Sequence, residues 1–285
     1  MSIWKDISAT IDPATAGLIA DLDAVLRPLS IEYMLVGAAA RDAIFQSVFN
    51  IHTGRKTVDV DFSVQVAAWV NYEAMASALV VGKKFTKDTK QRQRFFHHPG
   101  TVVDLIPFGG IEDAKGAIAW PPDGGFVMQA VGMREAMDNA VTLRVRSDPS
   151  LDIKVCSPVG MAILKLISWA DRKTRGGEKD AVDLLFLMRE YLNVPEIHPR
   201  GDDSDIWSEE RPFEEASARL LGRHIASLAS TSTRTILERI LIEEARTDGS
   251  MLLAMNMARE QLLLGSEDSL AKALLLIREL LAGMR

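Results

Sequence analysis

Residues 57–64 have the sequence TVDVDFSV, which sets the architecture expected for the first half of the chain. Apolar and polar residues alternate along it, and this predicts a β-strand because successive side chains of a strand point to opposite faces. Asp59 and Asp61 are two residues apart and therefore share one face. Adjacent carboxylates repel each other unless a cation lies between them. The stretch predicts a strand that binds a divalent cation; the alternative is a half-exposed strand whose acids face only solvent.

A third acid occupies a similar position further along the chain. Asp104 interrupts the apolar stretch VVDLIPF, residues 102–108, which follows a Pro-Gly turn. Residues 92–97 and 101–108 are therefore predicted to form a hairpin. If the second strand of this hairpin lies beside TVDVDFSV, the three carboxylates converge. Such oxygen ligands suit Mg²⁺, and two Mg²⁺ ions can stabilise both the attacking and the leaving oxygen of a phosphoryl transfer.

A glycine separates a predicted strand from a predicted helix upstream. Residues 33–36 form a short apolar run that ends at Gly37, and the alanine-rich residues 38–45 favour a helix. Glycine lets the backbone approach a ligand closely, and the amides at a helix start can bind phosphate. Many α/β proteins contain such a corner, so its significance here depends on the acidic strand that follows.

Five motifs in this order resemble the DNA polymerase β-like nucleotidyltransferase superfamily, and more narrowly its AbiEii-type family of abortive-infection and toxin–antitoxin toxins. The motifs are MLVGAAARDAIF (34–45), RKTVDVDFSV (55–64), VVDLIPFG (102–109), ILKLISWADR (163–172) and KDAVDLLFL (179–187). The resemblance covers residues 33–192. It implies an enzyme that uses Mg²⁺ and an NTP, transfers the NMP to a hydroxyl group of RNA, of a tRNA end or of a protein, and has a cognate antitoxin as partner.

The resemblance also implies a role for each residue that matches a family motif. Metal binding and catalysis fall to Asp59, Asp61 and Asp104, catalysis also to Lys165, Asp180 and Asp183, and nucleotide binding to Gly37, Ala38, Arg55, Thr57, Lys165 and Arg172. Asp104 would activate or orient the acceptor. Ala38 departs from the family, which has serine or a second glycine there. Phosphate binding would then rest on backbone amides and on other residues.

Several of these residues also have simpler local explanations. Lys165 lies in an apolar helical run, where its side chain either extends to the surface or is directed at phosphates. Asp180 and Asp183 share a helix face, but acids are favoured in the first turn of any helix. They could position Lys165 or Arg172, or act as a general base. Arg55 fits a surface arginine at a strand start equally well.

The overall pattern predicts an α+β protein in two domains. Strand and helix signals alternate over residues 1–155, whereas the rest is helical. We expect a nucleotidyltransferase α/β domain with a mixed sheet at residues 1–155 and an all-helical domain at 156–285 that completes the active site. The acidic residues 196–211 are the expected linker between helices. The predicted helices are 13–28, 71–81, 158–172, 178–191, 212–229, 233–246, 250–263 and 267–282, with further strands near 126–131, 140–146 and 151–155.

Charge is unevenly distributed along the chain. The formal net charge is −6, which excludes the broad positive field of a protein that grips duplex nucleic acid. Residues 83–94 nevertheless carry six basic side chains and one aspartate, and residues 201–215 carry seven acidic side chains and one arginine. The basic run is either a solvated surface or a contact for a phosphate-bearing acceptor such as RNA.

Cysteine content and hydropathy bear on location. Cys156 is the single cysteine, which excludes an internal disulfide and disfavours a cysteine-based zinc site. The first residues lack a signal-peptide pattern, and no apolar run reaches the roughly 18–20 residues that span a membrane. We therefore expect a cytoplasmic protein with no membrane partner.

Three other functions compete with this interpretation. A catalytically silent relative that binds a nucleotide or a partner protein is favoured by Ala38 and disfavoured by the three intact carboxylates. The G-x-x-x-R-D string of residues 37–42 resembles CCA-adding tRNA nucleotidyltransferases, although their arginine-rich nucleotide-reading motif is absent. A metal-dependent phosphohydrolase would need His/Asp ligand clusters that this sequence lacks.

Overall fold

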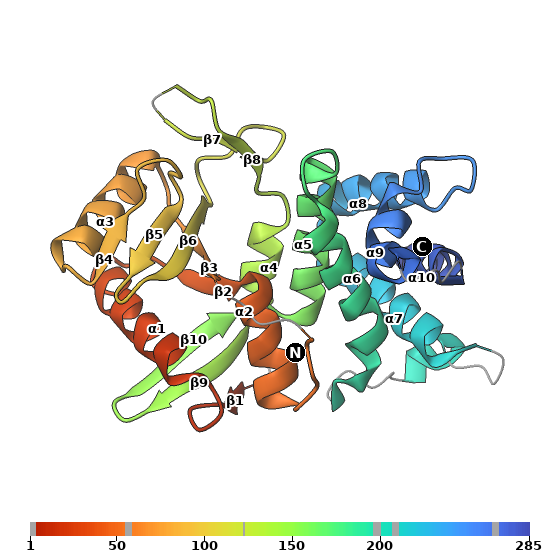
Figure 1. Cartoon of the computed structure of the whole chain (residues 1–285), viewed down its shortest axis with the longest axis horizontal. Coiled ribbons are helices and arrows are strands. Elements are labelled where there is room, and N and C mark those ends of the chain that lie inside the picture. The colour runs from red at the N-terminus through yellow and green to blue at the C-terminus, as the bar shows by residue number, and fades with distance from the viewer. Residues whose placement is uncertain (1–3, 55–58, 122, 196–200, 207–210, 264–267) are drawn as a thin grey trace. The chain divides into compact units, whose positions relative to one another are not determined.

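The computed structural model describes residues 4–54, 59–121, 123–195, 201–206, 211–263 and 268–285. The chain forms two compact units, Met1–Ser157 and Pro158–Arg285. The first unit holds strands and helices, and the regular elements described in the second are all helices (Figure 1). The predicted fold class, α+β with a mixed sheet followed by an all-helical part, is confirmed.

A mixed eight-stranded sheet is the centre of the first unit. Its strand order is β1-β9-β10-β2-β3-β6-β5-β4, with parallel pairs β1/β9, β10/β2 and β3/β6. The strands are β1 (Trp4–Asp6), β2 (Tyr33–Val36), β3 (Asp59–Gln65), β4 (Phe85–Lys87), β5 (Arg94–His97), β6 (Thr101–Phe108), β9 (Val141–Ser147) and β10 (Ser150–Val155). A separate two-stranded sheet pairs β7 (Ala117–Ala119) with β8 (Val127–Gln129).

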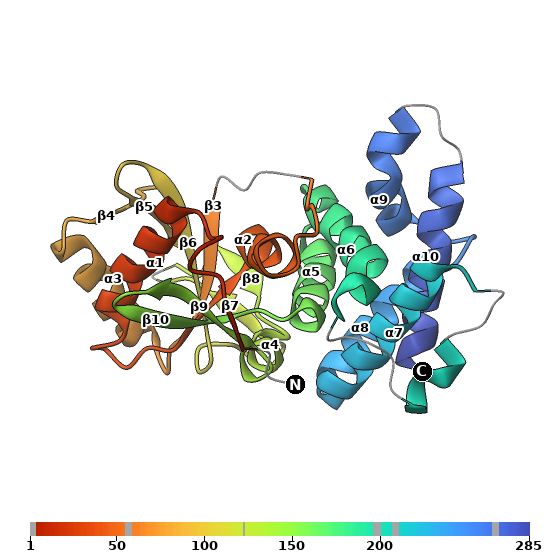
Figure 2. The same cartoon turned by 90° about the horizontal axis from the view of Figure 1, so that it is seen from below.

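Helices α1 (Pro13–Leu26) and α3 (Trp69–Val81) lie together against one face of the sheet (Figure 2). Tyr33 on β2 contacts the Phe62 ring edge-on and donates a hydrogen bond to Asp23 of α1 over 2.9 Å. The core of this unit therefore lies between that face and the two helices. Helix α1 starts as its sequence predicts, with the Asp12 carboxylate accepting from the Thr15 amide over 2.9 Å.

Helix α2 (Gly37–Arg41) follows β2 directly and begins beside Asp61 on the opposite face of the sheet. It continues into a π-helical segment, η1 (Asp42–Val48). The short helix α4 (Met133–Asp138) and the three-residue strands β1, β4 and β7 were not predicted.

Helices of the second unit agree with their predicted spans to within two residues at every end. They are α5 (Pro158–Arg172), α6 (Glu178–Glu190), α7 (Phe213–Leu228), α8 (Thr231–Glu244), α9 (Leu252–Leu263) and α10 (Asp268–Met284), with 3₁₀ segments η2 (Tyr191–Asn193) and η4 (Gly201–Ile206). In the part of the chain that the structure describes, no helix is both long and apolar enough to cross a bilayer.

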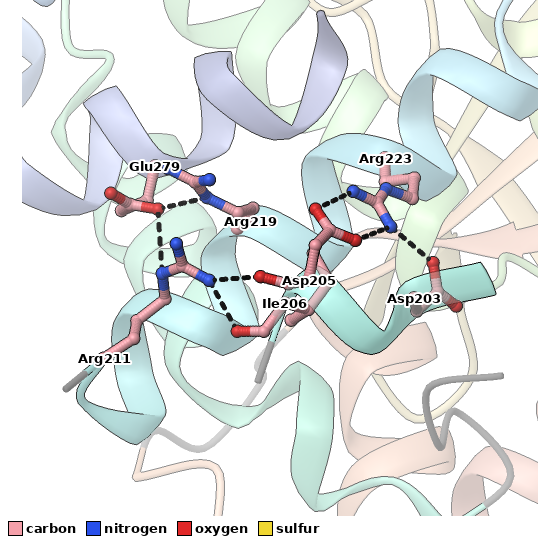
Figure 3. Close-up of polar contacts among 7 residues, drawn as sticks. All are labelled: Asp203, Asp205, Ile206, Arg211, Arg219, Arg223 and Glu279. Atoms are coloured by element: carbon pink, nitrogen blue, oxygen red, sulfur yellow. Dashed lines mark hydrogen bonds and ion pairs between the residues drawn. The ribbon is translucent and has the colours of Figure 1, made fainter. Parts of the chain in front are cut away.

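The predicted linker, residues 196–211, falls between the end of α6 and the start of α7 as expected, and its described part includes a short 3₁₀ segment. Residues 201–206 form η4, and Arg223 of α7 binds both Asp203 (2.9 Å) and Asp205 (2.7 Å) (Figure 3). Arg211 donates to the backbone carbonyls of Asp205 and Ile206. The carboxylates of Asp203 and Asp205 are therefore held by Arg223 on α7, a pairing that local composition cannot reveal.

Candidate active site

Three carboxylates converge on adjacent strands of the sheet. Asp61 on β3 is the parallel register partner of Asp104 on β6, and Asp59 lies two residues before Asp61 on the same face. One oxygen from each of the three lies within 4.8 Å of the other two. The side chain of Asp104 is only 12% exposed, while Asp59 and Asp61 are half-buried. The convergence expected from the sequence is present because β3 and β6 are neighbours.

An arginine missed by the sequence analysis holds the third carboxylate. Arg94, at the start of β5, is the antiparallel register partner of Asp104. Its Nε lies 2.9 Å from Asp104 Oδ1 and its Nη2 lies 2.7 Å from Oδ2. This hydrogen bonding is the largest cause that raises the pKa of Arg94 above its usual value. The sequence predicts the hairpin that brings basic residues near Asp104. Only the register between β5 and β6 shows which of them faces it.

A buried tyrosine joins α3 to this hairpin by hydrogen bonding. The Tyr72 hydroxyl donates to the Leu105 carbonyl over 3.2 Å and lies 3.4 Å from the Arg92 carbonyl. Burial raises the pKa of Tyr72 far above its usual value, with smaller contributions from the carboxylates of Glu73 and Asp104. The phenol therefore stays protonated and keeps donating to the strand backbone next to Asp104.

Gly37 brings the start of α2 against the carboxylates. Its φ is +67°, and a Cβ at this position would lie 2.3 Å from Asp61 Oδ2. Only glycine combines this backbone conformation with so close an approach. Among the described residues, no side chain caps this helix start. Backbone amides of the first turn have no partner within the helix itself, so this corner is suited to an anionic group.

Of three other predicted nucleotide contacts, the structure describes only Ala38. Ala38 lies in the first turn of α2 and offers its backbone amide but no hydroxyl. Arg55 and Thr57 lie outside the described residues, so their predicted roles remain predictions.

The remaining predicted residues form a charged cluster within the second unit. Lys165 on α5 lies 2.6 Å from Asp183 Oδ2 and 3.2 Å from Asp180 Oδ1, and Arg172 lies 2.5 Å from Asp180 Oδ2. The side chains of Asp180 and Asp183 are at most 6% exposed, and that of Lys165 is 18% exposed. Burial acts to lower the pKa of Lys165, but the two carboxylates outweigh it and raise that pKa. The ammonium therefore stays charged.

The basic run at residues 83–94 is largely paired within the protein. Four of its six basic side chains contact carboxylates: Lys84 with Asp21, Lys87 with Glu73, Arg92 with Asp123 and Arg94 with Asp104. Lys83 and Lys90 are exposed. Most of these side chains therefore form ion pairs within the protein. Less positive charge is available to a binding partner than the sequence indicates.

Comparison with solved structures gives a weak likeness, and the other comparisons give none. No protein-family model matches the sequence, and no curated protein matches it. Among solved structures, the antibiotic-resistance factor ANT(2'')-Ia, studied in solution, is 14% identical, with 90% of this chain and 95% of that chain covered and a TM-score of 0.36. A likeness at this level carries no argument about activity. The chemistry of the site rests on its own residues.

Proposed function

We propose that this protein is a Mg²⁺-dependent nucleotidyltransferase that transfers an NMP from an NTP to an acceptor hydroxyl. The observation that carries the proposal is the convergence of Asp59, Asp61 and Asp104 within 4.8 Å, beside a helix start opened by Gly37. Carboxylates for a hard cation and backbone amides for phosphate are thereby adjacent, and a bound NTP–metal complex needs both.

The donor set fits Mg²⁺ better than a softer metal. All three groups are carboxylates, and Mg²⁺ prefers oxygen ligands from a few side chains together with water and phosphate. Asp59 and Asp61 would hold the cation, and Asp104 would share it or face the acceptor. When bound, Mg²⁺ supplies charge neutralisation and alignment of the phosphates.

The residues then have separate tasks in one displacement. The acceptor oxygen forms a bond to the α-phosphorus as the bond from that phosphorus to the bridging oxygen breaks, and pyrophosphate leaves. Asp104 orients the acceptor hydroxyl and accepts its proton. The amides at Gly37 and Ala38 bind the triphosphate. Most of the rate enhancement comes from positioning and electrostatics, as in phosphoryl transfer generally.

Lys165 and Arg172 belong in this proposal as positive charges for the triphosphate. Asp180 and Asp183 keep the Lys165 ammonium charged and restrict its position, which favours the positioning role for the two acids over a general-base role. We expect Lys165→Met to raise the KM for NTP, whereas a purely structural lysine would change only the stability.

The acceptor and the biological role follow from the sequence resemblance. An AbiEii-type enzyme would modify RNA, a tRNA end or a protein, slow growth when expressed, and be neutralised by a cognate antitoxin. The exposed Lys83 and Lys90 remain for contact with an acidic acceptor. Growth arrest on expression that requires Asp59 and Asp61 would support the toxin role.

The decisive experiment is label transfer from each NTP, labelled at the α-phosphate, to total tRNA and to cell lysate with Mg²⁺. We expect transfer by the wild type, and at least about a hundredfold loss in Asp59→Asn and in Asp61→Asn. Asp248→Asn, a substitution of an exposed aspartate, is the matched control and should retain transfer. Transfer that survives both active-site substitutions would refute the proposal.

A silent nucleotide-binding relative is the second candidate, and Ala38 favours it because the serine or second glycine of the family is absent at this position. Metal-dependent NTP binding without transfer to any acceptor would support this candidate. Restoring the family residue with Ala38→Ser should then strengthen binding.

A further inference from the structure

Arg94 binds Asp104 in a bidentate manner. Its two hydrogen bonds are short, 2.9 Å and 2.7 Å, and each reaches a different carboxylate oxygen. The two side chains are largely sheltered, with 24% of Arg94 and 12% of Asp104 exposed. Fork-to-fork pairs of this kind fix the plane of the carboxylate, which a single hydrogen bond or a lysine cannot do.

The backbone of Arg94 is itself held in place from both sides. The Asp88 amide donates to the Arg94 carbonyl over 2.9 Å, and the Arg94 amide donates to the Gln91 carbonyl over 3.1 Å. The Asp88 carboxylate closes this turn by accepting from the amides of Lys90 and Gln91. The guanidinium is therefore presented by a fixed turn.

The contact has two consequences for the acid cluster. A carboxylate has about four lone-pair directions, and Arg94 occupies one on each oxygen, so Asp104 offers only the remaining ones in a fixed orientation. Arg94 also places one positive charge beside three negative ones, which weakens the attraction of the cluster for a cation.

We propose that Arg94 is a positioning residue that holds Asp104 in its working orientation at the expense of metal affinity. This inference rests on the proposed nucleotidyltransferase function. Arg94 does not touch the reacting atoms; it acts through Asp104. Its loss should therefore have opposite effects on two quantities: metal binding becomes tighter while turnover becomes slower.

A second arginine–aspartate pair in the same sheet offers a matched control. Arg144 on β9 faces its register partner Asp152 on β10 through the same fork, at 2.8 Å and 3.0 Å. That pair does not include any of the three acids. Arg144→Met removes an equivalent cross-strand contact and leaves the carboxylate cluster unchanged.

The test measures the Kd of Mn²⁺ alone, by calorimetry or by the loss of its free paramagnetic signal, together with kcat for label transfer. For Arg94→Met we expect Mn²⁺ to bind about threefold to tenfold more tightly and kcat to fall about a hundredfold. Arg94→Lys keeps the positive charge but loses the bidentate hydrogen bonding to Asp104. For this variant we expect near wild-type Mn²⁺ affinity with reduced kcat. Arg144→Met should change neither quantity.

Each outcome separates this inference from the proposed function. Mn²⁺ affinity that is unchanged or weaker in Arg94→Met, with the fold intact by circular dichroism, would overturn the inference, as would wild-type kcat in both Arg94 variants. If no protein, including the wild type, transfers label, the proposed function fails, and the Mn²⁺ measurements still decide whether Arg94 opposes metal binding.

Discussion

At the scale of single residues, the candidate site depends on a glycine as much as on its acids. Gly37 combines a positive φ with an approach to Asp61 that leaves no room for a methyl group. A non-glycine residue in the left-handed region costs about 1–2 kcal/mol before any clash is counted. The position is therefore constrained twice, once by its backbone and once by the carboxylate it adjoins.

We expect Gly37→Ala to lower the free energy of unfolding by about 1–3 kcal/mol and to weaken Mn²⁺ binding, because the new Cβ displaces the Asp61 carboxylate. Urea titration and calorimetry measure the two effects. Gly17→Ala is the control, since Gly17 lies exposed on α1 with open space around it. That substitution should stabilise the protein by about 0.5–1 kcal/mol. Equal behaviour of the two variants would contradict the role assigned to Gly37.

At the scale of elements, ion pairs join helices to the sheet edge. Asp21 of α1 accepts from Lys84 and lies 2.9 Å from His97 Nε2 on β5. Burial acts to raise the pKa of Asp21, but the hydrogen bonds from Lys84 and His97 outweigh it and lower that pKa. The ionised carboxylate is therefore the form that the fold favours.

This depressed pKa gives the fold a dependence on acid. The stability that Asp21 contributes is present above its unfolded pKa of about 3.9 and is lost as the pH falls through its lower folded value. Asp21→Asn should cost about 0.5–1 kcal/mol at neutral pH, a modest amount because Lys84 is largely exposed. The difference between wild type and variant in urea titrations should shrink as the solution is acidified. A difference that grows in acid would show the opposite sign.

Close packing of two helices depends on two further glycines. A Cβ at Gly222 of α7 would lie 2.0 Å from the Leu280 carbonyl oxygen, and one at Gly283 of α10 would lie 1.9 Å from that of Arg219. The same helices are joined by Arg219 and Glu279, 2.5 Å apart (Figure 3). Backbone rather than flexible side chain is the obstacle, so the helices would have to separate.

Gly222→Ala should therefore destabilise the helical unit although alanine is the better helix former. Overpacking of this kind costs about 1–3 kcal/mol, against a propensity gain of about 1 kcal/mol. Urea unfolding followed by circular dichroism would measure the net loss. A gain in stability, as expected for Gly17→Ala, would show that the two helices can move apart freely.

At the scale of the whole molecule, the acid cluster lowers the stability of the metal-free protein and provides a site for a cation. Three carboxylates in one place repel each other without a cation, and Arg94 offsets this only in part. A ligand that binds only the folded state raises its stability, by about 2.7 kcal/mol at a hundred times its Kd. The protein should therefore be less stable without metal than with it.

Mn²⁺ with NTP should raise the unfolding midpoint by about 5–10 °C, and a chelator should reverse the shift. Asp59→Asn should abolish the shift and, in chelator, unfold at a slightly higher temperature than the wild type because one repelling charge is gone. Calorimetric scans measure both. Arg144→Met should keep the full shift, and a metal response that persists in Asp59→Asn would exclude this site as its source.

Local sequence was sufficient for most elements and for part of the site. Strand alternation placed Asp59 and Asp61 on one face, the Asp12 cap marked the start of α1, and apolar periodicity located α5 through α10. These features depend on residues only a few positions apart in the sequence, so a local pattern is enough to predict them.

The rest of the site depends on contacts between residues far apart in the sequence. The parallel pairing of β3 with β6 sets Asp104 beside Asp61, and the register of β5 selects Arg94 from six basic residues as its partner. Likewise, η4 is held by Arg223, which lies on α7. Strand order, register and long-range ion pairs are settled by burial of the whole core, so a local pattern leaves them open.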